Sequence, residues 1–207
     1  MDRTKARGPY AKTAARRAGI IRAARDSFAE HGYEGASLRD IAKRAGITHA
    51  AVLHHFENKD ELLTAVLAQR DDEEWERGFA EAGALDSPAQ YLGELLRRHQ
   101  ETPELMRLWA ELSASASRPD HPARAYFVDR NERVRSYTAG VLREREAQGR
   151  LPEGLDPDSA AALLQAVLHG LQTQWLLNQE LDIVKPLNRF FDLILLPVER
   201  GRSTDTP

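Results

Sequence analysis

SLRDIAKRAGITHAAVLHHF, residues 37–56, has the pattern of two short helices joined by a tight turn. Ser37 can cap the first helix, and Asp40 follows three residues later in a weaker form of the capping box. Gly46 comes directly after the last apolar position of that helix, where a left-handed backbone usually requires glycine. Thr48 can cap the second helix. The stretch therefore predicts a helical hairpin with well-defined ends.

Two helices joined by a short turn that contains glycine match an ordinary helical hairpin and also a DNA-binding helix-turn-helix. In the helix-turn-helix, the second helix enters the major groove and its first residues contact base edges. Helical spacing gives this second helix an outer face that consists of Thr48, His49, Ala50, Leu53 and His54.

The flanking sequences separate these alternatives. Residues 16–70, about a quarter of the chain, closely resemble the N-terminal DNA-binding domain of the tetracycline-repressor (TetR) family. The matching residues are Ile21, Ala24, Phe28, Gly32, Tyr33, Ser37, Ile41, Ala42, Ala45, Gly46, Ile47, His55, Phe56, Lys59 and Leu62. The remaining chain resembles the family only in its helical pattern and its length. The resemblance implies a mode of DNA binding and leaves the preferred DNA sequence open.

Two positions depart from the family pattern. The family commonly has a tyrosine where this chain has Leu53, and often a lysine where it has His49. The family's tyrosine usually contacts a phosphate and a base, so the equivalent contact is in doubt here. His49 keeps the capacity to form hydrogen bonds.

We predict a DNA-binding set with two kinds of contact. Phosphate contacts are expected from Ser37, Thr48, His55 and Lys59, and base contacts from His49, Ala50 and Leu53. Arg39 and His54 complete the set without a specific role. Lys59 lies in the first turn of a helix that Asn58 can cap. A cation is unfavourable at the positive end of a helix unless an anion offsets its charge, so this lysine indicates a phosphate partner.

The charge distribution fits a DNA-binding head on an acidic body. The chain of 207 residues has a formal net charge of −3, with a balance of +6 in residues 1–59 and −9 in residues 60–207. Phosphate contacts need local positive charge.

There is no cysteine, which excludes disulfides, thiolate metal sites and cysteine nucleophiles. The sequence has no apolar run long enough to span a membrane, and its N-terminal residues have no apolar signal-peptide core. We therefore expect a cytoplasmic protein without membrane contact.

The periodicity predicts an all-α protein of about nine helices. We expect a helix-turn-helix domain in residues 1–60, with a flexible arm in 1–12, then a helical regulatory and dimerisation domain in 61–200 and a disordered tail in 201–207. Outside the hairpin, the predicted helices span about 13–31, 58–81, 88–101, 103–116, 120–148, 157–179 and 186–200.

The two C-terminal helices are apolar on more than one face, so each requires more than one packing partner. One partner is the body's own core, and the other can be the same pair of helices in a second subunit. TetR-like proteins typically dimerise in this way. We therefore predict a homodimer through residues 157–179 and 186–200, with Phe191 and Leu195 in its seam.

No nucleophile elbow, phosphate-binding glycine loop or metal-binding motif is present, so we expect no enzyme activity, cofactor or metal. A small-molecule effector site in the body is more plausible, as the family resemblance implies. Gln165, His169 and Gln172 share one stripe of an otherwise apolar helix, and each needs a partner if it is buried. The other candidate ligand-binding residues are Trp75, Phe79, Met106, Trp109, Tyr126 and Phe127.

These patterns together predict a dimeric regulator that binds a double-stranded DNA operator. The favoured form is a repressor that a small hydrophobic effector releases from its operator. The alternatives are a ligand-insensitive DNA-binding protein of the same fold and, with no motif in its support, an enzyme.

Overall fold

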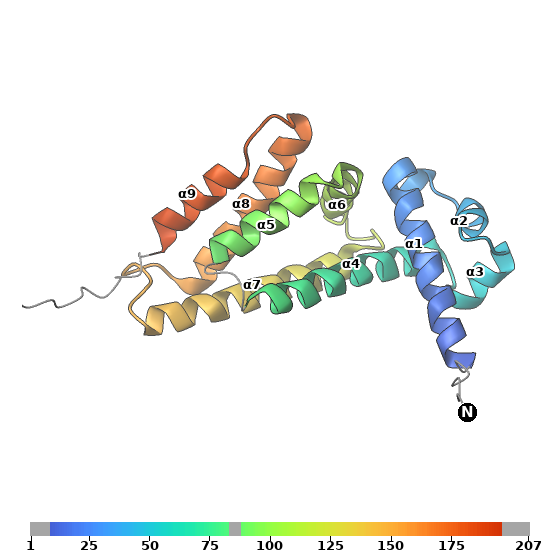
Figure 1. Cartoon of the computed structure of the whole chain (residues 1–207), viewed down its shortest axis with the longest axis horizontal. Coiled ribbons are helices and arrows are strands. Elements are labelled where there is room, and N and C mark those ends of the chain that lie inside the picture. The colour runs from blue at the N-terminus through green and yellow to red at the C-terminus, as the bar shows by residue number, and fades with distance from the viewer. Residues whose placement is uncertain (1–8, 83–87, 196–207) are drawn as a thin grey trace, which may run out of the picture. The chain divides into compact units, whose positions relative to one another are not determined.

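The computed structural model describes the backbone of residues 9–82 and 88–195, and the side chains of residues 11–77 and 88–195. Within these ranges the chain forms nine α-helices and no strand (Figure 1). The helices are α1 (Pro9–Gly35), α2 (Leu38–Arg44), α3 (His49–His55), α4 (Lys59–Ala82), α5 (Pro88–Gln100), α6 (Pro103–Ser115), α7 (Arg124–Ala147), α8 (Pro157–Leu177) and α9 (Val184–Ile194). The all-α fold predicted from the sequence is confirmed.

The chain divides into two compact units. The first unit consists of residues 1–81 and 104–127, and the second consists of residues 82–103 and 128–207. The first unit thus contains α1 to α3, most of α4, nearly all of α6 and the first turn of α7. The second contains α5, the rest of α7, α8 and α9.

One hydrophobic cluster among the described residues extends through the first unit. Its most deeply buried side chains come from the part of the chain that runs from α1 to the first turn of α4: Ile20, Phe28, Ile41, Val52, Phe56, Leu62 and Leu63. The same cluster continues into α6 through Leu108, Trp109 and Leu112, and into the first turn of α7 through Phe127. The two short helices α2 and α3 are therefore anchored to a core that they share with α6.

Helix α1 begins four residues earlier than predicted. Pro9 opens the helix, because proline has the backbone angle of a first helical residue and needs no hydrogen-bond acceptor for its nitrogen. Residues 9–12, expected in the arm, are therefore helical, and residues 1–8 lie outside the described part of the chain. At Gly32, which was predicted to end the helix, φ is 70° and ψ is 170°, so helical geometry is interrupted there.

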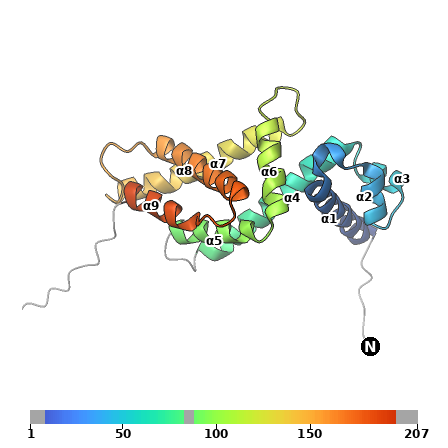
Figure 2. The same cartoon turned by 90° about the horizontal axis from the view of Figure 1, so that it is seen from above.

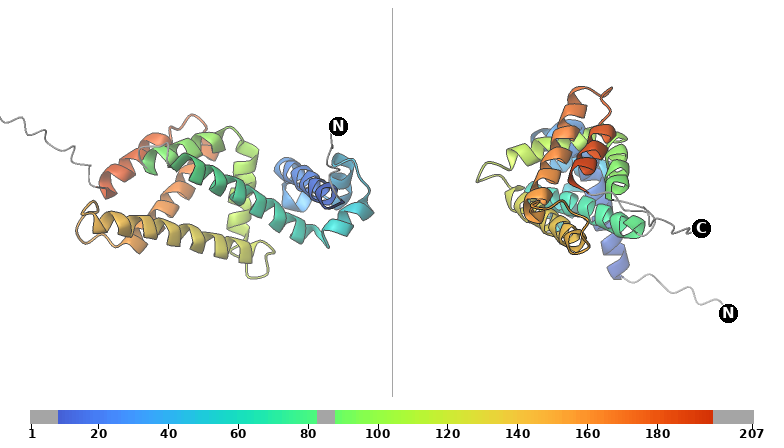
Figure 3. Two further views of the ribbon diagram at one scale, coloured as in Figure 1. Left: turned by 60° about the horizontal axis from the view of Figure 1, so that its bottom comes forward. Right: turned by 90° about the vertical axis from the view of Figure 1, so that its left-hand side faces the viewer.

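In the second unit, α9 packs against both α5 and α8 (Figures 2 and 3). The side chains of Leu96 on α5 and of Ile183 and Leu187 at α9 are almost completely buried. A smaller cluster joins α7 to α8 through Ala139, Leu142, Ala160 and Ala161.

Two helix starts in the body differ from the prediction. Helix α9 starts at Val184, before Pro186, because the carboxylate of Asp182 accepts hydrogen bonds from the backbone N–H groups of residues 184 and 185, each at 3.0 Å. Helix α7 starts at Arg124, after the predicted start near residue 120. The preceding turn is closed by the Arg124 N–H, which donates to the His121 carbonyl at 2.9 Å. Pro122 disfavours helical geometry at the residue before it, His121.

Some predicted features fall outside the described residues. These are part of the break at 83–87, the end of the last helix beyond Leu195, the tail at 201–207 and the side chain of Phe79. Among the helices that the structure describes, none combines the length and the apolar character needed to cross a membrane.

Candidate nucleic-acid interface

The turn between α2 and α3 is built by local hydrogen bonds. The Ser37 hydroxyl accepts from the Asp40 N–H at 3.2 Å and caps α2, and the Thr48 hydroxyl accepts from the Ala51 N–H at 3.1 Å and caps α3. Gly46 has a φ of 67°. Its N–H donates to Lys43 O at 3.1 Å. The next N–H, that of Ile47, reaches back to Ala42 O at 3.0 Å, which completes a Schellman motif. The predicted caps and glycine turn are confirmed.

Helix α3 has one buried face and one exposed face. Val52 within the helix and Phe56 at its end are at most 1% exposed and fix the helix to the core. Ala50, Leu53 and His54 share the opposite face and are all exposed. His49 and His55 lie between the two faces and are half-buried. The side chains at the centre of the face predicted to contact DNA therefore do not pack in the core of the first unit.

Lys59 has partners within its own chain. Its ammonium donates to the carbonyls of Tyr33 at 2.9 Å, Ala36 at 3.3 Å and Glu34 at 3.5 Å. It also lies 4.4 Å from the centre of the Tyr33 ring, within range of a cation–π interaction. These groups supply the negative potential that the position of Lys59 in the first turn of α4 requires. A phosphate is thus not needed to explain a lysine there.

Sequence reasoning missed the role of Tyr33 and Asp60 in this cluster. The Tyr33 hydroxyl donates to the Asp60 carboxylate, and the ring packs against Phe28 in the core with centroids 5.7 Å apart. Burial raises the pKa of Tyr33, and the hydrogen bond to Asp60 raises it further. The only available signal was the match of Tyr33 and Lys59 to one family pattern. Their 26-residue separation in sequence gave no hint of contact.

The remaining predicted DNA-binding residues differ in their exposure and in whether their polar groups already form hydrogen bonds within the chain. Arg39 is exposed on α2. The Ser37 hydroxyl donates to the Asp40 carboxylate at 2.5 Å, so its proton is already in use. Thr48 is exposed, and only its acceptor role is used by the cap. Arg17 lies over the Phe56 ring with its guanidinium carbon 4.8 Å from the ring centre, which places one cation of α1 next to the end of α3.

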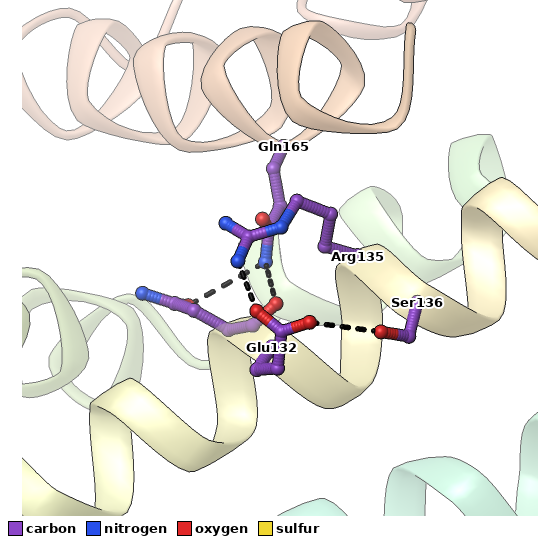
Figure 4. Close-up of polar contacts among 5 residues, drawn as sticks. Glu132, Arg135, Ser136 and Gln165 are labelled. Atoms are coloured by element: carbon purple, nitrogen blue, oxygen red, sulfur yellow. Dashed lines mark hydrogen bonds and ion pairs between the residues drawn. The ribbon is translucent and has the colours of Figure 1, made fainter. Parts of the chain in front are cut away.

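The polar stripe of α8 finds partners on neighbouring helices. The Gln165 amide nitrogen reaches from α8 to α7, where it lies 3.4 Å from the Asn131 carbonyl, near the Glu132–Arg135 ion pair (Figure 4). The Gln172 amide nitrogen lies 2.9 Å from Nδ1 of His99 on α5. Burial lowers the pKa of His169, and the charge of Arg130 lowers it further. Gln165 and Gln172 therefore have the hydrogen-bond partners that buried amides in this stripe need.

The aromatic candidates form a packed group in the first unit. Trp109 and Phe127 meet edge to face with ring centroids 4.9 Å apart, and Tyr126 lies 5.3 Å from Phe127. The Tyr126 hydroxyl donates to the buried carboxylate of Asp71 at 2.6 Å. Met106 is also buried, whereas Trp75 is half-buried. The stripe of Gln165, His169 and Gln172 belongs to the second unit, so no one compact unit contains the whole predicted set.

Helices α8 and α9 expose large apolar side chains. Leu163 and Leu177 of α8 are 52% and 85% exposed, and Leu193 of α9 is 65% exposed. Phe191, which the sequence analysis placed in an intersubunit seam, is only 5% exposed, and Leu195 packs against the cluster between α7 and α8. The prediction is wrong for Phe191, because its side chain is buried in the core of its own subunit. Leu195 is half-buried, so its place in the seam stays a prediction.

An exposed second helix, held on a basic head by two caps and a glycine turn, defines a helix-turn-helix DNA-binding protein. Residues 20–66 match the model of bacterial regulatory proteins of the tetR family, and residues 86–185 match the C-terminal model of BetI-type transcriptional repressors. The HTH-type transcriptional repressor Rv1474c of Mycobacterium tuberculosis is 33% identical, with 74% of this chain and 91% of that protein covered. The chain therefore belongs to the TetR family of transcriptional regulators.

Solved structures have the same fold. SmeT, the repressor of the Stenotrophomonas maltophilia multidrug efflux pump SmeDEF, is 26% identical with a TM-score of 0.67, and the match covers 86% of this chain and 90% of SmeT. The regulator FadR of Bacillus subtilis, in complex with stearoyl-CoA, is 23% identical with a TM-score of 0.69, and the match covers 85% and 96% of the two chains. The predicted class, a DNA-binding transcriptional regulator with a helical C-terminal domain, is confirmed.

Proposed function

We propose that the protein is a cytoplasmic, homodimeric repressor that binds an operator through α3 and leaves it when a small hydrophobic molecule binds the body. The observation that carries the proposal is the exposed face of α3, formed by Ala50, Leu53 and His54 opposite the buried Val52. The name of the Mycobacterium relative supports repression. In this proposal residues 1–60 bind DNA, and residues 61–200 regulate and dimerise.

The DNA contacts divide into two groups. Bases are contacted by His49, Ala50 and Leu53, with His54 on the same exposed face. Thr48, Arg39 and His55 contact phosphates, since the Thr48 hydroxyl proton is free to donate while its oxygen caps α3. Ser37 and Lys59 stay in the predicted set, but their donor groups already have partners. Their contribution is to hold the start of α2 and the residues that lead into it in place.

The length of α3 supports a two-fold dimer. A helix of seven residues contacts few base pairs, and two heads on successive major grooves double the readout. The half-sites are then about 34 Å, one helical turn, apart or a multiple of that. The exposed leucines Leu163, Leu177 and Leu193 support α8 and α9 as the dimer surface, because an interface would remove these large apolar side chains from water.

The effector would bind in the body near His169. Burial lowers the pKa of the His169 imidazole and so favours its neutral form. A ligand site is usually an apolar pocket with a few placed polar groups, and a neutral imidazole can be one of them. The stearoyl-CoA complex of Bacillus subtilis FadR supports this, since the same fold holds an acyl ligand there. A ligand-insensitive repressor is the second candidate, favoured by the partners of Gln165 and Gln172 within the chain.

Nuclease protection with the purified full-length protein tests the DNA-binding part of the proposal. The expected result is a protected two-fold site, with His49→Ala changing which sequences are preferred and Arg39→Ala weakening binding to all of them. Arg22→Ala, at an exposed arginine of α1 outside the predicted set, is the matched control. Protection of no specific site, or equal sequence preferences in wild type and His49→Ala, would contradict the assignment.

Release by an effector requires a separate measurement. A panel of hydrophobic compounds is screened for loss of operator binding by the wild-type protein. An active compound is expected to reduce affinity 5- to 150-fold, and His169→Ala should blunt that response while ligand-free binding is retained. No response to any compound would favour the ligand-insensitive repressor.

A further inference from the structure

The exposed face of α3 is mostly apolar at its centre. Leu53 is 43% exposed, although leucine is usually buried in a folded domain. Ala50 precedes it by three residues and lies on the same exposed face. The hydrophobic core cannot use either side chain, because Val52 and Phe56 occupy the buried face.

Helix α3 lacks the side chains that usually read bases. Its sequence, HAAVLHH, contains no arginine, lysine, asparagine or glutamine. Arginine and lysine pair with guanine, and asparagine and glutamine pair with adenine, through two hydrogen bonds each. Leucine and alanine have no hydrogen-bonding group. In the major groove, the apolar group that can identify a base is the C5 methyl of thymine.

We propose that Leu53 reads thymine by packing against this methyl group, and that the small Ala50 side chain lets α3 approach the bases closely. The inference rests on the proposed function and adds a specificity for thymine at one position of each half-site. Burial of one methyl contributes about a fourfold change in affinity. A two-fold site contains two such contacts, so the expected effect is about 15-fold if the two are independent.

The test removes the methyl without changing base pairing. An operator is first selected from random duplexes with the full-length protein, and each thymine of a half-site is then replaced by deoxyuridine, in both half-sites at once. Binding is measured for wild type and for Leu53→Ala. Because Leu53 is exposed, this variant leaves no cavity in the core, and circular dichroism checks that it is folded. Val128→Ala, at a 55% exposed apolar residue of α7, is the control variant.

One thymine position should show a loss of about 15-fold on replacement in wild type and in Val128→Ala. Leu53→Ala should lose a similar factor on the natural operator, with no further loss on the deoxyuridine operator. Less than a twofold loss at every thymine, or a loss that persists in Leu53→Ala, would overturn the inference while operator binding stands. If no sequence is selected from the random duplexes, the proposed function itself fails.

Discussion

Lys59 illustrates how one side chain can be assigned to two different roles. From sequence, a lysine in the first turn of α4 indicates a phosphate partner. In the folded chain, its ammonium donates to three carbonyls at the end of α1 and just after it, and lies over the Tyr33 ring. Both roles place positive charge at the same point, but they differ in what happens without DNA.

The Lys59→Ala variant separates the two roles. We expect the free energy of unfolding to fall by about 1–3 kcal/mol, because hydrogen bonds from a charged group are lost and carbonyls lose their donor. Urea denaturation without DNA measures this change. Lys43→Ala, at an exposed lysine of α2, is the matched control and should be nearly neutral. Unchanged stability together with weaker, less salt-dependent DNA binding would instead establish the phosphate contact.

His169 is expected to make the stability of the protein sensitive to acid. Burial, and then the charge of Arg130, hold its pKa below the ordinary value of 6.5. The unfolded chain therefore binds a proton more readily than the folded one. The stability that neutral His169 contributes is complete above pH 6.5. It is lost progressively as the pH falls from 6.5 through the lower pKa of the folded state.

The His169→Gln variant tests this dependence. Its melting temperature should fall less between pH 7 and pH 5 than that of wild type, because glutamine does not titrate. His54→Gln, at an exposed histidine of α3, controls for the loss of a histidine as such and should keep the wild-type profile. Identical profiles for wild type and His169→Gln would show that His169 is not the residue that senses pH.

At the scale of elements, the turn between α2 and α3 depends on one glycine. Gly46 has a φ of 67°, and a Cβ atom built there would meet no other atom within 4 Å. A substitution therefore has only a backbone cost. This makes the position a clean test of the conformation that brings α3 to its exposed orientation.

Gly46→Ala should reduce the free energy of unfolding by about 1–2 kcal/mol, the cost of a left-handed L-residue. Gly19→Ala is the matched opposite. Gly19 lies inside α1, and a Cβ there also has no neighbour within 4 Å, so alanine should stabilise the chain by about 0.5–1 kcal/mol. Chemical denaturation of both variants gives the comparison. Equal changes of the same sign would refute the argument from backbone conformation.

At the scale of the whole molecule, the surface of α8 and α9 decides the assembly. Leu163 and Leu193 are more than half exposed in one subunit, so a charge at either position costs little in a monomer. In an apolar interface the same unpaired charge is severely unfavourable. Substitution therefore separates dimerisation from folding, which a change at the buried Phe191 could not do.

Leu163→Glu and Leu193→Glu should sediment as folded monomers at micromolar concentration, whereas wild type should sediment as a dimer. Val128→Glu, at a similarly exposed residue of α7, should remain dimeric. Circular dichroism of each variant reports whether the helices are retained. A monomeric wild-type protein, or dimers of both leucine variants, would contradict the proposed interface.

The sequence by itself determined the features that depend on neighbours within one helical turn. The caps at Ser37 and Thr48 and the left-handed glycine at position 46 are all formed as predicted. Each of these needs only residues up to five positions away. For this reason the hairpin, the order of the helices and most of their ends could be predicted, and with them the candidate DNA-binding face of α3.

Only the tertiary structure decided which of the remaining side chains are available. Lys59 is engaged by carbonyls 23 to 26 residues away, and Gln172 is paired with a histidine 73 residues away. Phe191 is used in its own subunit's core, whereas Leu163 and Leu193 are left exposed. Helical periodicity indicates that a face is apolar, but it does not specify which neighbour covers it. That choice depends on the packing of helices distant in sequence, and no local pattern encodes it.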